Sequence, residues 1–123
     1  MRILTISKPY VAQIYRDKLT QWASMGMEVA LICPPAWGTQ FYEPTPEEPF
    51  ETHQIPIRFN GHNHFHFYHS KKIKKVMEEF NPDILNIEEE HYSIVTSHLL
   101  WLSRNIKCKR VFYTWQNIDK QYP

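Results

Sequence analysis

The sequence predicts an α/β fold of the Rossmann type, in which helices cover both faces of a parallel sheet. Short apolar segments, typical of strands buried on both sides, alternate along the chain with segments whose apolar residues recur at helical spacing. This alternation indicates a three-layer α/β/α architecture. We expect five parallel strands in the order 3-2-1-4-5, numbered along the chain. The chain has 123 residues, 42% of them apolar and 22% charged, which fits a single domain over residues 1–123.

The first two strands and the first helix come from the N-terminal part of the chain. Residues 2–7 and 28–33 are short apolar runs and predict strands one and two. Residues 11–25 predict an amphipathic helix between them, which ends before Gly26. The apolar stripe of this helix consists of Val11, Ile14, Tyr15, Leu19 and Trp22.

A proline-rich loop and an edge strand follow. Residues 34–49 contain five of the nine prolines, so we expect a surface loop without regular structure. Its aromatic residues, among them Trp37, either hold the loop against the domain or stack on a ligand. Residues 53–59 carry Ile55, Ile57 and Phe59 in alternation and predict strand three. Pro56 has no N–H for a sheet ladder, which places this strand at an edge of the sheet.

The second half of the chain predicts a helix, a strand, a second helix and a final strand. Residues 68–80 predict the first helix, with an inward face formed by Ile73, Val76, Met77 and Phe80. Residues 84–87 predict strand four, residues 93–105 the second helix, and residues 111–113 strand five. A strand, crossover helix and strand of this length form a parallel unit, whose strands end at the same edge of the sheet.

Candidate ligand-binding side chains follow three of the strands at that edge. In open α/β sheets, ligands bind outside the C-terminal ends of the strands, where the strand order reverses. Carboxylates accept hydrogen bonds from sugar hydroxyls, and aromatic rings pack on sugar faces. Two alternatives stay open: the acids at 88–90 complement the dipole of the following helix, and the amides at 116–117 cap a strand end. The candidates are Lys8, Tyr10, Glu88, Glu89, Tyr92, Trp115, Gln116 and Asn117.

Several ligand classes lack their sequence pattern. The turn at residues 7–10 has no glycine, which argues against NAD, FAD and a flavin phosphate, and no Walker A pattern occurs. Four histidines within eight residues suggest a metal, but no carboxylate or cysteine stands at ligand spacing beside them, so we expect no metal site. These histidines are His62, His64, His66 and His69.

Charge and cysteine content bear on the partners and the compartment. The net charge of +1 gives no argument for nucleic acid as a partner. Four lysines within residues 71–75 predict either a solvated helix face or a patch that contacts a membrane surface or a phosphate. Cys33 and Cys108 predict buried free thiols, typical of a reducing compartment. No apolar run approaches the roughly 18–20 residues of a membrane span. We therefore expect a cytoplasmic protein, with peripheral contact to the inner face of a membrane as an option.

Two segments carry a resemblance to a known family. Residues 81–93, NPDILNIEEEHYS, and residues 111–117, VFYTWQN, resemble the N-terminal half of family 4 glycosyltransferases, and residues 1–35 are similar to it as well. The resemblance implies a GT-B enzyme with two Rossmann-like domains, which transfers a sugar with retention and without an essential metal. The N-terminal domain would bind a sugar or glycolipid acceptor. A C-terminal domain, which this chain does not contain, would bind the nucleotide sugar.

The chain departs from that family at two positions. Many members have a glycine pair after strand one and a histidine after strand five, where this chain has residues 7–10 without glycine and Gln116. Glutamine forms hydrogen bonds but cannot act as a titrating base, so no catalytic residue is assigned. We expect this chain alone to transfer no sugar. We also expect Glu89→Gln to weaken acceptor binding by about 1–2 kcal/mol, with a small effect on folding. The alternative function is a stand-alone flavodoxin-like binding or regulatory module without enzymatic activity.

Overall fold

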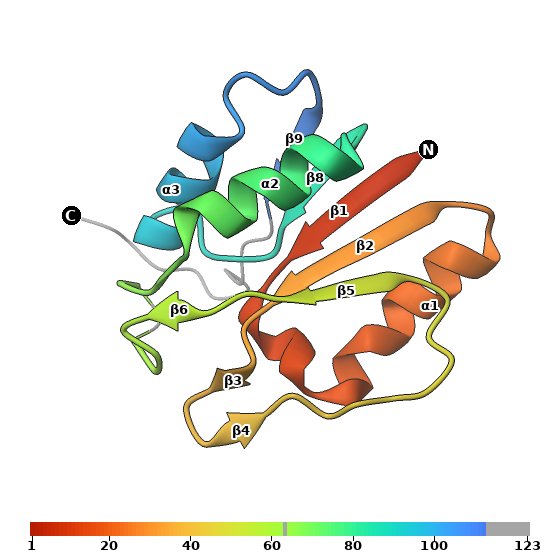
Figure 1. The fold of residues 1–123 in the computed structure, drawn as a ribbon, viewed down its shortest axis with the longest axis horizontal. Helices are drawn as coiled ribbons and strands as arrows, with labels where there is room; N and C mark the ends of the chain where they lie inside the picture. Colours follow the sequence, from red (N-terminus) through yellow and green to blue (C-terminus); the bar gives the residue numbers. More distant parts are fainter. Residues whose placement is uncertain (63, 113–123) are drawn as a thin grey trace, which may run out of the picture.

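The computed structural model describes residues 1–62 and 64–112 and contains a five-stranded parallel sheet (Figure 1). The strands stand in the order β5-β2-β1-β8-β9, and every neighbouring pair is parallel. This is the predicted order 3-2-1-4-5, which is therefore confirmed. The strands are β1 (Arg2–Ile6), β2 (Glu28–Cys33), β5 (Glu51–Gln54), β8 (Ile84–Ile87) and β9 (Lys109–Phe112).

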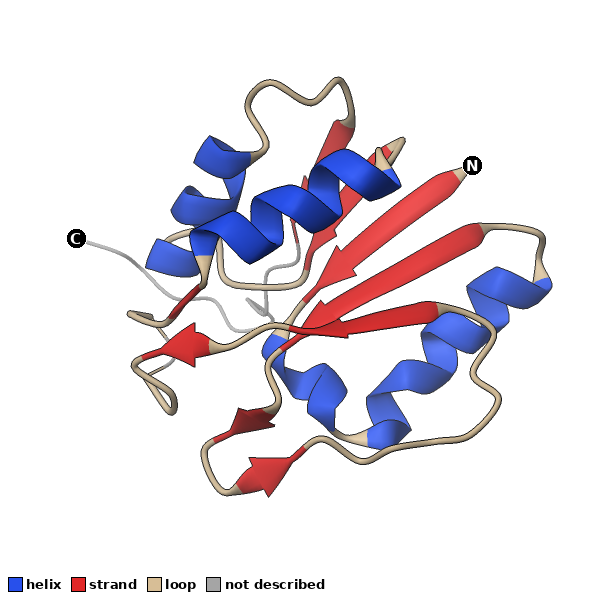
Figure 2. Cartoon of the chain, in the orientation of Figure 1, coloured by secondary structure: helices blue, strands red, loops and turns tan. Residues whose placement is uncertain are grey.

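Helices cover both faces of the sheet, as predicted (Figure 2). Successive side chains of a strand point to opposite faces, so β2 contributes to an apolar layer on each side of the sheet. Leu4 and Ile32 pack on one face with the buried residues of α2 (Ser70–Phe80) and α3 (Ile94–Leu102). Leu31 packs on the other face with Leu19 of α1 (Asp17–Ser24).

The predicted helix over residues 11–25 is shorter than expected. Residues Lys8–Val11 and Gln13–Arg16 form two separate 3-10 turns, and α1 begins only at Asp17. Ala12 between the turns is extended, and the buried Arg16 guanidinium donates hydrogen bonds to carbonyl groups that a continuous helix would use internally. As a result, Ile14 and Tyr15 are not in a buried stripe; they are 79% and 57% exposed.

The segment around the prolines also differs from the expectation. Part of the predicted irregular loop is an antiparallel hairpin of β3 (Ala36–Trp37) and β4 (Gln40–Phe41). The edge position of the third sheet strand is confirmed, but β5 ends at Gln54, before Pro56. Beyond that proline, β6 (Ile57–Arg58) leaves the sheet and pairs antiparallel with β7 (Phe67–Tyr68).

The second half of the chain follows the prediction closely. Strand β8 has the predicted bounds, and α2 starts two residues later than expected with its predicted inward residues all buried. Helix α3 ends at Leu102, three residues early, and Ile94 at its start is exposed. Both cysteines are free; Cys33 is buried, whereas Cys108 is half-buried. None of the helices within the described residues has the length and apolar character needed to cross a membrane.

Candidate functional site

The C-terminal ends of β1 and β8 border a hollow of about 680 Å³, which we call the β1–β8 hollow. These are the two neighbouring strands at which the strand order reverses. Residues that directly follow β1 and β8 form much of the lining, and the 3-10 turns, the start of α1 and the β3–β4 hairpin supply the rest. Its charged lining consists of Lys8, Asp17, Lys18, Glu88, Glu89 and Glu90, and its aromatic and aliphatic lining of Tyr10, Ile14, Tyr15 and Trp37.

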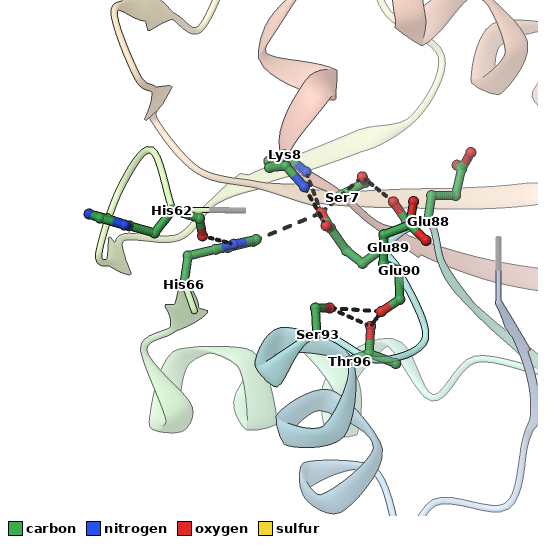
Figure 3. Close-up of polar contacts among 9 residues, drawn as sticks. All are labelled: Ser7, Lys8, His62, His66, Glu88, Glu89, Glu90, Ser93 and Thr96. Atoms are coloured by element: carbon green, nitrogen blue, oxygen red, sulfur yellow. Dashed lines mark hydrogen bonds and ion pairs between the residues drawn. The ribbon is translucent and has the colours of Figure 1, made fainter. Parts of the chain in front are cut away.

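Glu89 is the buried centre of the polar contacts in this region (Figure 3). Its side chain is only 1% exposed. Its Oε1 accepts hydrogen bonds from the Ser7 hydroxyl and the Lys8 backbone N–H, both at 3.1 Å, and its Oε2 lies 2.6 Å from the Lys8 ammonium. The Ser7 hydroxyl also lies 2.6 Å from the Glu88 carbonyl, which ties the ends of β1 and β8 together.

The turn after β1 therefore already binds a negatively charged group of the protein itself, the Glu89 carboxylate. In nucleotide-binding α/β folds, backbone N–H groups at this turn bind a phosphate of the ligand. Here the Lys8 backbone N–H and its ammonium both bind the Glu89 carboxylate instead. This position of the fold offers an incoming phosphate few of the donors that it would need.

Glu88 lies beside Glu89 in the wall of the hollow and is the more exposed of the two side chains. The Tyr10 hydroxyl donates a hydrogen bond to its Oε2, which also accepts one from the Asn86 amide at 3.2 Å. The Lys18 ammonium lies 2.5 Å from its Oε1. The Glu88 side chain is 12% exposed, so its carboxylate has a limited access to solvent. A ligand hydroxyl can use the remaining acceptor capacity of this carboxylate.

Glu90 differs from its two neighbours in how it is held. Its backbone carbonyl accepts hydrogen bonds from the hydroxyls of Ser93 and Thr96, at 2.8 and 2.7 Å. These bonds fix the turn between β8 and α3. The Glu90 side chain lines the β1–β8 hollow, and within residues 1–62 and 64–112 its carboxylate has no hydrogen-bond or ion-pair partner.

Trp37 reaches the site from the β3–β4 hairpin. The Lys8 ammonium lies 5.1 Å from the centre of its ring, and the ring packs edge-on against His66 with 4.7 Å between centroids. Asn60 fixes the hairpin by accepting from the Gly38 N–H and donating to the Ala36 carbonyl. The sequence left open whether Trp37 contacts a ligand or holds the loop against the domain. Ile14, Tyr15 and Lys18 also line the hollow, but the sequence does not predict them as site residues because their spacing fits a regular amphipathic helix.

Only some of the predicted site residues line this hollow. Lys8, Tyr10, Glu88 and Glu89 are brought together as expected. Tyr92 is not part of the lining; it is 54% exposed and its ring packs against those of His64 and His91. The predicted residues Trp115, Gln116 and Asn117 lie outside the described residues.

The histidine run contributes one buried ring to the region. The Nδ1 atom of His66 donates to the His62 carbonyl at 3.1 Å, and Nε2 lies 4.0 Å from Glu89 Oε1. His69 instead caps α2, where its ring accepts a hydrogen bond from the Lys72 backbone N–H. In the part of the chain that the structure describes, no three His, Cys, Asp or Glu side chains are grouped so that they could hold a metal ion.

Neither a protein-family model nor a curated protein matches this chain. The fold and the geometry of the β1–β8 hollow are therefore the basis for the function proposed below.

Proposed function

We propose that this chain is the acceptor-binding domain of a retaining GT-B glycosyltransferase, which moves a sugar from a nucleotide-sugar donor to an acceptor. The observation that carries the proposal is the β1–β8 hollow at the reversal of the strand order, where carboxylates and aromatic rings line one space. Carboxylates accept hydrogen bonds from sugar hydroxyls, and aromatic rings pack against the apolar faces of sugar rings. The acceptor would be a sugar or a glycolipid.

The assignment to the acceptor side, and not to the donor side, is supported by Glu89. A nucleotide sugar brings two phosphates, which need donors such as the N–H groups of a glycine-rich turn. In this chain the turn donors at Ser7 and Lys8 are already bound to Glu89. The nucleotide sugar would therefore bind to a C-terminal domain. The same observation weighs against the alternative, a flavodoxin-like module, to the extent that such a module binds a flavin phosphate.

The roles of the individual residues follow from their access to the hollow. Glu88, with a partly exposed carboxylate, would accept hydrogen bonds from acceptor hydroxyls, and Tyr15 and Trp37 would contact the faces of its rings. Glu89 would support the site without contacting the acceptor, by holding Lys8 and the turn after β1 in place. Such an enzyme would work in the cytoplasm. The exposed lysines of α2 would provide a peripheral contact with a membrane surface.

Titration of the 123-residue chain with sugars and with nucleotide sugars tests the proposal. NMR is suited to the weak binding that we expect, because hydrogen bonds in half a cleft compete with water and contribute little net free energy each. Simple sugars should shift the indole N–H signal of Trp37, which is assigned by comparison with Trp37→Phe. Nucleotide sugars should give no binding in calorimetry. Micromolar affinity for a nucleotide sugar would reverse the assignment of donor and acceptor sides.

Glu88→Gln and Glu78→Gln form a matched pair of variants for this titration. Both remove one carboxylate charge, but Glu88 lines the hollow and Glu78 is an exposed residue of α2. The first variant should bind the sugars more weakly, and the second should behave as the wild-type chain does. Equal sugar affinity in both variants would contradict the proposed role of the hollow.

A further inference from the structure

The charges of the β1–β8 hollow narrow the chemical class of the acceptor. We propose that the part of the acceptor that enters the hollow carries no phosphate or carboxylate, and that an amine-bearing sugar is preferred to its neutral analogue. This inference rests on the proposed function, since it describes the substrate of the same site.

The two lysines of the hollow are already neutralised by the protein. The Lys8 ammonium lies 2.6 Å from Glu89, and the Lys18 ammonium lies 2.5 Å from Glu88. An anionic ligand would have to compete with these carboxylates, which are held in place by further hydrogen bonds from Ser7 and Asn86. Two like charges within one site repel each other, and the repulsion is stronger where water is partly excluded.

Two further carboxylates of the lining have no cation beside them among the described residues. Asp17 accepts a hydrogen bond from the uncharged amide of Gln21 at 3.2 Å, and the Glu90 carboxylate has no partner in residues 1–62 and 64–112. With two lysines and four carboxylates, the described lining has a net charge of −2. A concave surface with a net charge attracts ligands of the opposite sign.

The lining also offers apolar contact to a sugar. The ammonium groups of Lys18 and Lys8 already lie 5.6 Å and 5.1 Å from the ring centres of Tyr10 and Trp37, so the attraction of a ligand amine rests on the carboxylates of Asp17 and Glu90 and not on these two rings. Ile14 and Tyr15 are exposed at the side of the hollow because the first helix starts late, and they offer apolar contact to the C–H face of a sugar. An amine-bearing sugar has both the cationic group and the apolar face that this lining accommodates.

Three sugars of one size separate the possible outcomes. Glucose, glucosamine and glucose 6-phosphate are titrated into the 123-residue chain at a pH where the amine is protonated, with the Trp37 indole signal as the readout. Glucosamine should bind about threefold to fivefold more tightly than glucose at low salt, as expected for one partly exposed ion pair. High salt should reduce this preference because it screens the charges. Glucose 6-phosphate should bind more weakly than glucose.

Variants connect the preference with the unneutralised carboxylates. Glu90→Gln should lower the ratio of glucosamine to glucose affinity, whereas Glu78→Gln, on the exposed face of α2, should leave the ratio as it is in the wild type. If Glu90→Gln does not fold, the exposed Asp17→Asn at the start of α1 should lower the same ratio.

The outcomes distinguish this inference from the proposed function. If glucose 6-phosphate binds as tightly as glucose or more tightly, or if the carboxylate variants leave the ratio unchanged, the inference is wrong while the proposed function stands. If none of the three sugars shifts the Trp37 signal, the proposed function fails and the inference fails with it.

Discussion

Replacement of Glu89 by glutamine tests whether this buried carboxylate holds the site together. Glutamine keeps the shape of the side chain and removes its charge. In the wild type, the carboxylate accepts from the Ser7 hydroxyl, the Lys8 N–H and the Lys8 ammonium. The amide of glutamine has only one oxygen, so at least one of these donors will face an N–H group instead. We therefore expect the folded chain to lose stability.

We estimate the loss in the free energy of unfolding at about 2–3 kcal/mol. Removal of one partner from a fully buried ion pair costs about 3–5 kcal/mol, because the other charge is left without compensation. Lys8 is 16% exposed, so its ammonium can turn toward water and recover part of that cost. This estimate replaces the expectation of a small effect on folding, which assumed that Glu89 was accessible to an acceptor.

Urea unfolding, followed by tryptophan fluorescence, measures the effect. Glu78→Gln on the exposed face of α2 is the control and should stay within about 0.5 kcal/mol of the wild type. A double-mutant cycle with Lys8→Met isolates the ion pair, because Lys8→Met should cost less in the Glu89→Gln background than in the wild type. If Glu89→Gln is as stable as Glu78→Gln, or if the cycle gives no coupling, Glu89 does not hold the turn after β1.

A small anion offers an independent check on the same reasoning. Glu89→Ala would leave the donors of Ser7 and Lys8 around an empty space. Formate should then stabilise Glu89→Ala more than chloride does at equal ionic strength, because a ligand that binds only the folded state raises its stability. The wild-type chain should respond equally to both salts. An equal response in the variant would indicate that these donors do not form an anion site.

Three further predictions concern other parts of the chain. Burial lowers the pKa of His98 from its ordinary value of 6.5, so the unfolded chain binds more protons at this residue than the folded chain does. The wild type should therefore lose stability as the pH falls below about 6.5. In urea titrations, His98→Gln should lose less stability over the same pH range, and parallel pH profiles of the two chains would contradict this. Arg16 is buried and forms hydrogen bonds and an ion pair with the segment 43–48. Arg16→Met should therefore lower the free energy of unfolding by about 3 kcal/mol and expose that segment to a glutamate-specific protease. An unchanged cleavage rate would show that Arg16 does not hold this segment in place. Burial raises the pKa of the Cys33 thiol to about 12, so a thiol reagent should label the half-buried Cys108 in the native chain and Cys33 only after unfolding; rapid native labelling of Cys33 would refute this.

The places where the prediction from sequence was wrong have a common physical cause. Periodicity correctly located α2 and β8, because their buried residues recur at the spacing of a helix or form one apolar run. The helix at 11–25 had a similar periodicity, yet its first turns were displaced by Arg16, which binds backbone carbonyls there and also reaches Glu48. A contact between residues so far apart along the chain leaves no local signal in the sequence.

The sequence by itself determined the parallel sheet, its strand order and the edge at which Lys8, Tyr10, Glu88 and Glu89 gather. It did so because apolar runs define strands, and because parallel strands have their C-terminal ends at the same edge of the sheet. Only the tertiary structure decided which of the two adjacent acids in the lining is fully buried and which keeps contact with solvent. Ser7 and Glu89 are 82 positions apart, and their contact depends on the pairing of β1 with β8. That pairing buries Glu89 against Lys8 and leaves Glu88 partly exposed at the hollow. The sequence alone does not predict this difference, because the two neighbouring residues are identical.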